Sequence, residues 1–348
     1  MIGMGKRQVT LHLGMSKTGT TFLQKVFFPK LQSVNFKNQP RTDIIEGGPY
    51  QGLLARAFKR SPYIWDEIGD QLFGELFDGL EPGSLPEQIL ISDQSAGPAM
   101  TEHEPYTGSY WEKERKDPFL LANHLKCFIE EAKRWGITNV QVLLVFRRQD
   151  EWIASKYAQR SDRLEHASQE HFEERIRYTL SRSAGYFTDG IVLDYNRLCH
   201  QLTEAVGKYN LLMVPYEWLQ QDKAGFLTSI SKFISDENGY DTETESVRRI
   251  LKSGKNQKKN VRSLSENTWE LRQNHSDIPS IRLRPARIWN ALGLPSEISL
   301  SMKTLKKPEV IVLKESMRNE IINVYKASNR ALSEKLGLDL ARYGYYSS

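Results

Sequence analysis

The most constraining stretch of this sequence is VTLHLGMSKTGTTFLQ, which begins at Val9. Its apolar start predicts a strand over Val9–Leu13, and the pattern that follows predicts a helix over Thr18–Phe28, ending at a proline. The first turn of a helix carries unpaired backbone N–H groups and partial positive charge, so a loop leading into it attracts anions. Gly14 and Gly19 let that loop turn tightly and approach a ligand closely. The sequence therefore predicts an anion-binding unit built from a strand, a loop and a helix.

The rest of the chain alternates between strand-like and helix-like patterns. Further strands of the buried type are expected at Ile89–Ser92, Val140–Phe146, Ile191–Leu193 and Leu211–Val214. Helices are expected at Phe119–Trp135, Arg197–Tyr209, Leu219–Ile234, and from Asp150 to Tyr157 with an extension toward Arg182. This alternation predicts an α/β fold with a P-loop-like parallel sheet of about five strands flanked by helices.

Beyond Ile234 the pattern turns helical, with SENTWELRQN and ESMRNEIINVYKASNRALSEKLG as the clearest pieces. We expect one domain over residues 1–348, with an insertion at about 31–87 and a helical extension at about 264–348. No apolar stretch approaches the roughly 18 residues that span a bilayer, and no signal-peptide pattern is present. If the chain is complete, a cytoplasmic location is expected.

The composition restricts the ligand class. The net charge of +5 fits an anionic ligand, whereas nucleic-acid binding would call for a longer basic stripe. Cys127 and Cys199 lie far apart in apolar-patterned stretches and are expected to be buried reduced thiols. No His/Cys cluster has metal-ligand spacing, so no metal is expected.

The loop differs from a nucleotide-binding P-loop in the position of its lysine. Gly14 and Gly19 have the spacing of G-x-x-x-x-G-K-[ST], but Thr20 stands where that motif has lysine, and Lys17 lies inside the loop instead. The run S-K-T-G-T-T resembles the 5′-phosphosulfate loop, P-K-[ST]-G-T-T, of sulfotransferases that use 3′-phosphoadenosine 5′-phosphosulfate (PAPS), with Ser16 in place of the usual proline. The resemblance implies that PAPS is bound by the loop residues Ser16, Lys17, Thr18, Gly19, Thr20 and Thr21.

A second motif follows the strand expected at Val140–Phe146. Arg147 comes directly after this strand, and Ser155 lies eight residues later on the following helix. This R-x₇-S pattern resembles the 3′-phosphate site of the same family, where an arginine and a hydroxyl grip a terminal phosphate. The form F-R-R-Q-x-E-W-x-x-S-x-Y-x-Q resembles bacterial members in particular. Both motifs lie past the carboxyl ends of expected strands, where ligands bind in open parallel sheets.

Three further stretches fit this resemblance. The segment ending in Tyr216–Leu219 resembles the late sheet portion of the family, and Glu217 within it is interpreted as a helix-start residue. The basic run Lys252–Arg262 contains K-N-V-R-S, which is similar to the loop that closes over the adenosine end of PAPS and implies contacts from Asn260 and Arg262. A solvated charge run explains this segment equally well. The ending SNRALSEKLGLDLARYGY also resembles bacterial members.

The resemblance implies transfer of a sulfuryl group with adenosine 3′,5′-bisphosphate as product and PAPS as co-substrate. Lys17 is placed to neutralise charge on the leaving phosphate oxygen, and the low charge of a sulfuryl group makes a metal unnecessary in principle. The general base is expected to be Asp93, at the end of the strand ILISDQ, because Gln94 stands where the family has glutamate. Asp93 could instead cap a turn, and Glu102, His103, Glu104 and His12 are the alternatives.

The expected acceptor is a carbohydrate or glycolipid hydroxyl, or an amine. Aromatic and amide groups that could stack on and hydrogen-bond a sugar are Tyr106, Tyr110, Trp111, Tyr157 and Gln159. A small metabolite, a lipid headgroup and a peptide tyrosine remain open as acceptors, as does the oligomeric state. The alternative functions are a P-loop-type small-molecule kinase and a non-catalytic anion- or glycan-binding protein.

Overall fold

The computed structural model describes residues 7–38, 53–58, 60–93, 120–164, 166–181, 193–235, 240–252, 263–265, 267–272, 280–283, 298–301 and 309–347. The chain divides into two compact units, and both are discontinuous in sequence. The first unit is formed by residues 1–152, 178–257 and 319–348, and the second by residues 153–177 and 258–318.

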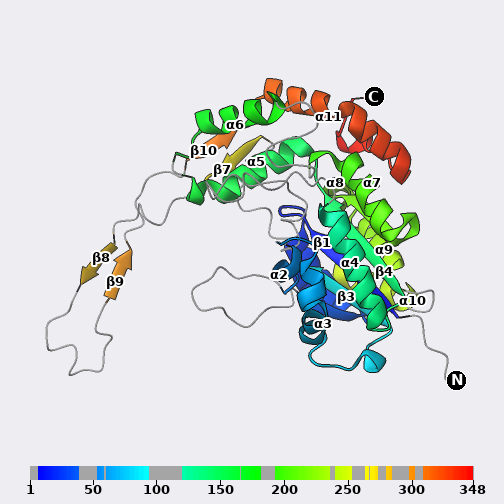
Figure 1. Ribbon diagram of the computed structural model, residues 1–348. Coiled ribbons are helices and arrows are strands. Elements are labelled where there is room, and N and C mark those ends of the chain that lie inside the picture. The colour runs from blue at the N-terminus through cyan, green and yellow to red at the C-terminus, as the bar shows by residue number, and fades with distance from the viewer. Residues whose placement is uncertain are drawn as a thin grey trace. The chain divides into compact units, whose positions relative to one another are not determined.

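The first unit is built on a parallel sheet of five strands. In spatial order these are β2 (Asn35–Asn38), β3 (Gln88–Asp93), β1 (Gln8–Gly14), β4 (Asn139–Phe146) and β5 (Leu211–Pro215). All neighbours pair in parallel, with Leu13 beside Asp93 on one side and Gly14 beside Val145 on the other. The predicted α/β class with about five parallel strands flanked by helices is confirmed (Figure 1).

The central strands are buried on both faces because helices cover both, and most of their side chains are apolar. One face buries Leu90, Leu143 and Val214 under helices that follow the β1 loop or lie late in the first unit. These are α1 (Thr20–Phe22), the π-helical turn η1 (Leu23–Phe27), the 3₁₀ turn η2 (Phe28–Lys30), α8 (Tyr216–Gln221), α9 (Lys223–Ile234) and α10 (Tyr240–Lys252). A strand that is buried on both sides has no polar face, which explains the continuous apolar runs.

The opposite face of the sheet is covered by a second group of helices. The Phe146 ring packs on the Tyr195 ring of α7 (Tyr195–Val206), with centroids 5.0 Å apart. Helix α7 contacts α4 (Leu120–Arg134), which in turn contacts α2 (Ala55–Phe58) and α3 (Ile64–Leu76). Figure 1 shows α3 and α4 beside the central strands. An aromatic group from α3 and α4, including Phe73 and Phe128, fills the space between those two helices.

The edge of the sheet differs from the prediction. The fifth strand is β2, from the segment interpreted as an insertion, and not Ile191–Leu193. Residues 191 and 192 lie outside the described part of the chain, and Leu193 is not in a strand. β2 is short and partly exposed, as is usual for an edge strand, so it lacks the apolar run by which buried strands are found.

The second unit contains two small antiparallel sheets and helices α5 and α6. Strands β6 (Ser263–Ser265), β7 (Thr268–Glu270) and β10 (Val310–Val312) form one sheet in the order β10-β7-β6, and β8 (Ser280–Leu283) pairs with β9 (Ile298–Ser301). Helices α5 (Gln149–Arg160), α6 (Gln169–Ser181) and α11 (Glu315–Leu336) each have residues in both units.

The prediction of a helix over SENTWELRQN is therefore wrong. This segment forms the hairpin of β6 and β7, in which Trp269 is fully buried and Leu264 is exposed. Asn267 follows the turn and its side chain accepts hydrogen bonds from Ser265 and Thr268. Thr and Trp favour strands, and Asn267 stabilises a turn, so this segment forms strands where a helix was predicted. The long helix predicted from ESMRNEIINVYKASNRALSEKLG is present as α11.

Candidate functional site

The loop after β1 has an unusual backbone. Lys17 has φ 67° and Gly19 has φ 79°, so two alternate residues lie in the left-handed region. For a lysine this conformation costs about 1–2 kcal/mol, and such strain is concentrated at ligand-binding sites. The buried Thr18 hydroxyl donates to the Met15 carbonyl over 2.7 Å, which closes the loop on itself. The Gly19 carbonyl accepts from the Phe22 and Leu23 N–H groups and begins the helical segment.

Arg147 leaves the end of β4 and reaches this loop. Its Nη1 donates to the Lys17 carbonyl over 3.3 Å, and its Nη2 contacts a Glu151 carboxylate oxygen over 2.8 Å. Its guanidinium carbon lies 5.3 Å from the centre of the Tyr216 ring. The arginine is 6% exposed, and its Nε has no hydrogen-bond partner among the described residues. The two motifs predicted to bind phosphate therefore lie in direct contact.

The sheet order explains why these two loops meet. β1 lies between β3 and β4, and the chain builds β2 and β3 on one side of it and β4 and β5 on the other. The connections that leave β1 and β4 thus run to opposite sides, and in open α/β sheets the ligand-binding crevice forms at such a switch point, at the carboxyl ends of the strands. Ser16–Thr21 and Arg147 lie at this edge.

Neighbouring elements hold the loop from both sides. Trp152 of α5 donates its indole N–H to the Ser16 carbonyl over 3.0 Å. On the other side, a methyl group added at Gly19 would lie 3.0 Å from Tyr216 Cε2 and 3.1 Å from Leu219 Cδ2. Glycine at position 19 is therefore required by the backbone angle and by this close approach.

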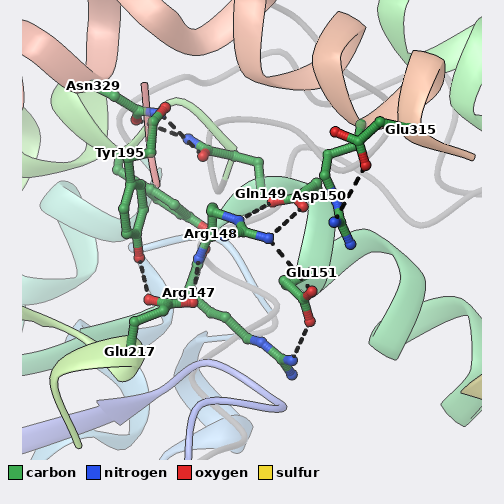
Figure 2. Close-up of polar contacts among 11 residues, drawn as sticks. Arg147, Arg148, Gln149, Asp150, Glu151, Tyr195, Glu217, Glu315 and Asn329 are labelled. Carbon is green, nitrogen blue, oxygen red and sulfur yellow. Dashed lines mark hydrogen bonds and ion pairs between the residues drawn. The ribbon is translucent and has the colours of Figure 1, made fainter. Parts of the chain in front are cut away.

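A polar network continues from Arg147 along the chain, as Figure 2 shows. The Arg148 guanidinium makes two bonds to the fully buried Asp150 carboxylate, at 2.6 and 2.9 Å. The Arg148 backbone N–H donates to Glu217 over 3.1 Å. Gln149 and Asn329 of α11 exchange two amide hydrogen bonds, at 2.9 and 3.1 Å. The end of β4 is thus fixed by groups from several elements of the first unit.

Asp93 ends β3, directly beside Leu13 in the sheet register. It is 1% exposed, and its Oδ2 accepts a hydrogen bond from the Leu54 backbone N–H over 3.2 Å. In this arrangement the carboxylate caps the turn that leads into α2, which is the alternative role weighed for it from the sequence. Its position at the carboxyl edge of the sheet remains compatible with proton transfer.

His12 lies inside the sheet, on the face covered by η1 and η2. Its Nδ1 is 2.6 Å from Ser92 Oγ, which also accepts from the Gln24 side chain over 2.9 Å. Ser92 Oγ accepts the hydrogen bond from Gln24, so the Ser92 hydroxyl can donate to His12 Nδ1. His12 is then the tautomer that carries its hydrogen on Nε2. That Nε2 is buried without a partner in the described structure. Burial lowers the pKa of His12 to about 3, so the ring is neutral near pH 7.

The other predicted residues belong to the second unit or fall outside the described part of the chain. Ser155 is buried on α5 and belongs to the second unit. Tyr157 is also buried there, where its ring packs on Phe172 and its hydroxyl bonds to His171, so it is a core residue and not an exposed sugar platform. Residues outside the described part of the chain are Gln94, Glu102, His103, Glu104, Tyr106, Tyr110, Trp111, Asn260 and Arg262.

Sequence reasoning missed Glu151, Trp152 and Tyr216 as neighbours of the anion-binding motifs. Glu151 could have been found, because a carboxylate four residues after an arginine is well placed for an ion pair on a helix. Trp152 and Tyr216 had no comparable signal, since their contacts depend on how α5 and α8 meet the β1 loop.

The two cysteines of the chain are the remaining candidates for reactive groups. Cys127 is partly buried and Cys199 is buried, both as free thiols, and burial raises the pKa of each. Within the ranges that the structure describes, no group of three His, Cys, Asp or Glu side chains is arranged to hold a metal ion. The helices in these ranges include none that is long and apolar enough to cross a membrane.

The fold and the site together define an α/β protein with a P-loop-like turn at the switch point of a parallel sheet. The chain is similar to a solved sulfotransferase from Alicyclobacillus acidocaldarius, with 10% identity, a TM-score of 0.46, and coverage of 97% of this chain and 98% of that one. It is also similar to a mouse sulfotransferase solved in complex with PAP, with 12% identity, a TM-score of 0.39, and coverage of 98% and 89%. No protein-family model and no curated protein matches the sequence. At TM-scores below 0.5, these two likenesses carry no weight for the function.

Proposed function

We propose that this protein transfers a sulfuryl group from PAPS to a hydroxyl or amine, with a carbohydrate or glycolipid as the acceptor class. The observation that carries the proposal is the contact between Arg147 and the carbonyl of Lys17. Two motifs 130 residues apart, each resembling one phosphate-binding element of PAPS-dependent sulfotransferases, meet at the crevice between β1 and β4. A nucleotide with charged groups at both its 5′ and 3′ positions requires two such elements side by side.

In this proposal the β1 loop binds the 5′-phosphosulfate. Its backbone N–H groups and the Thr20 and Thr21 hydroxyls supply donors, while Thr18 braces the loop through Met15. Lys17 neutralises the charge that develops on the phosphate oxygen as the sulfur–oxygen bond breaks. The acceptor oxygen or nitrogen forms the new bond to sulfur, adenosine 3′,5′-bisphosphate leaves, and the acceptor's proton passes to a base.

Arg147 and Ser155 are proposed to bind the 3′-phosphate, and Asn260 and Arg262 the adenosine end of the nucleotide. Arg147 already has a carboxylate neighbour in Glu151, so a bound phosphate would share or replace that contact. Its Nε is a buried donor, and an anion at this edge would give it a partner.

Asp93 is the proposed base. Its Oδ2 accepts from the Leu54 N–H, and its place at the end of β3, beside Leu13 of β1, brings the carboxylate to the sheet edge at which the β1 loop begins. His12 is a weaker candidate for the base, because Ser92 engages its Nδ1 and burial lowers its pKa to about 3.

The test combines turnover and binding. We expect labelled PAPS to yield a sulfated product with at least one member of an oligosaccharide panel, and adenosine 3′,5′-bisphosphate to bind without Mg²⁺ in isothermal titration. Lys17→Ala should reduce turnover by about a hundredfold or more, as expected when one strong transition-state contact is lost. Lys25→Ala, which removes an exposed lysine from η1, is the matched control and should behave as wild type.

Three outcomes would contradict the proposal. Binding of ATP alone, and only with Mg²⁺, would favour the small-molecule kinase. Nucleotide binding without turnover on any acceptor class would favour a non-catalytic anion-binding protein. Full turnover in a folded Lys17→Ala variant would remove Lys17 from the mechanism.

A further inference from the structure

The peptide group between Arg147 and Arg148 is held by side chains on both of its polar atoms. Tyr195 of α7 donates its hydroxyl to the Arg147 carbonyl over 2.6 Å. On the other side of the same peptide, the Arg148 N–H donates to Glu217 Oε1 over 3.1 Å. A peptide plane fixed at both atoms cannot rotate, so the direction in which Arg147 leaves the strand is fixed as well.

Glu217 is itself held in place by a residue beyond α11. Its Oε2 accepts a hydrogen bond from the Tyr345 hydroxyl over 2.8 Å, and Tyr345 is fully buried. The Tyr345 carbonyl accepts in turn from the Asn329 side chain over 3.1 Å. Tyr345 is thus anchored at its backbone and at its hydroxyl, with Glu217 between it and the end of β4.

The ionisation states favour this arrangement. Burial raises the pKa of Tyr195 and of Tyr345 well above the usual tyrosine range, so both hydroxyls remain donors at any ordinary pH. Burial also raises the pKa of Glu217, while the Arg148 N–H and the Tyr345 hydroxyl offset part of that cost for the carboxylate. Both oxygens of Glu217 are engaged inside the protein, so this carboxylate is not placed to take a proton from a substrate.

We propose that Glu217 and Tyr345 are positioning residues that aim the Arg147 guanidinium at the 3′-phosphate of the bound nucleotide. This inference rests on the proposed function, because it assigns a target to Arg147. It gives a role to a segment outside both phosphate-binding motifs, in which Tyr345 lies 198 positions after Arg147 in the sequence. The contribution of Tyr345 is indirect, since its hydroxyl touches only Glu217 among the contacts described here.

The test is the nucleotide selectivity of Tyr345→Phe, which removes one hydroxyl and keeps the ring. Titration should show a loss of affinity for adenosine 3′,5′-bisphosphate of about fivefold or more, in line with the loss of a hydrogen bond to a charged group. Affinity for adenosine 5′-phosphate, which lacks the 3′-phosphate, should change by less than about twofold. Tyr343→Phe removes a hydroxyl from the same segment without a described hydrogen bond and should leave both affinities unchanged.

The outcomes separate this inference from the proposed function. If wild type binds the bisphosphate and Tyr345→Phe binds it equally well, or loses both nucleotides equally, the positioning role is wrong and the proposed function stands. If wild type does not bind the bisphosphate, both fail. Should Tyr345→Phe not fold, Tyr195→Phe loosens the same peptide from its other side and must show the same selective loss.

Discussion

At the scale of single residues, the sequence pattern identified candidate phosphate-binding groups but not the residues that support them. Lys17 was identified from its place in the loop S-K-T-G-T-T, and Arg147 because it directly follows a buried strand. Glu217 was interpreted as a helix-start residue, and it does lie in the first turn of α8. Its bonds to Arg148 and Tyr345 could not be predicted, because they join residues 69 and 128 positions apart. Side-chain hydrogen bonds over such separations leave no local pattern.

His12 gives the residue-scale prediction on pH. Its pKa in the folded protein is about 3, against 6.5 in an unfolded chain, so below pH 6.5 the unfolded state binds the additional proton. The stabilising effect of keeping this ring neutral is complete above pH 6.5 and is lost as the pH falls toward 3. His12 should therefore contribute up to about 1.4 kcal/mol per pH unit to the fall in unfolding free energy.

The measurement is urea unfolding between pH 7 and pH 4. His12→Asn retains a polar atom near Ser92 and should show a shallower fall than wild type in this range. His200→Gln changes an exposed histidine on α7 and should keep the wild-type slope. Equal slopes for wild type and His12→Asn would show that the ring is protonated in the folded state.

At the scale of elements, the buried strands were predictable and the edge strand was not. β1, β3, β4 and β5 each extend the predicted runs by one or two residues, because continuous apolar stretches are required where helices cover both faces. The helix predicted over Thr18–Phe28 is present as three consecutive helical turns: the α-helical α1, the π-helical η1 and the 3₁₀-helical η2. The helical segment continues through Pro29 to Lys30. Proline is tolerated there because it lies in the first turn of the 3₁₀ segment.

Gly19→Ala tests the packing of the β1 loop against α8. A left-handed backbone angle costs alanine about 1–2 kcal/mol, and the added methyl group would also press on Tyr216 and Leu219. We expect the unfolding free energy to fall by roughly 1–4 kcal/mol, and bisphosphate binding to weaken because Tyr216 supports Arg147.

Gly337→Ala is the matched control for this change. Gly337 also has a positive φ, of 63°, but no atom lies within 4 Å of an added methyl group. Gly337→Ala should lower the unfolding free energy only by the cost of the left-handed backbone angle. It should leave the affinity for the bisphosphate unchanged. Equal losses of unfolding free energy in the two variants would show that Tyr216 and Leu219 move away from the added methyl group at no cost in stability.

At the scale of the whole molecule, the fold class could be predicted from the alternation of strands and helices. The first unit is assembled from three segments, and the amide pair of Gln149 and Asn329 joins two of them. The sequence pattern of one segment does not predict which residues of another segment it contacts. One domain over 1–348 stays a prediction, made from length and from the order of strands and helices.

Asn329→Ala tests how strongly these segments depend on each other. Both amide side chains are buried, at 2% exposure for Gln149 and 0% for Asn329. Removing Asn329 leaves the Gln149 oxygen without its donor and the Tyr345 carbonyl without the Asn329 N–H. We expect the unfolding free energy to fall by about 2–4 kcal/mol, since each buried polar group that loses its partner costs about 1–3 kcal/mol.

Asn323→Ala provides the control, because it changes an exposed asparagine on the same helix. It should shift the unfolding free energy by less than about 0.5 kcal/mol in either direction. A loss in Asn329→Ala no larger than in this control would mean that water replaces the amide pair without cost.

The Gln149–Asn329 pair also has a consequence for biosynthesis. The two residues are 180 positions apart, and a ribosome adds roughly 5–20 residues per second. Between about 10 and 40 seconds therefore pass after Gln149 is made before its partner exists. During that time the Gln149–Asn329 pair cannot form. The end of β4 therefore gains its last supporting contacts only when α11 has been made, late in synthesis of the chain.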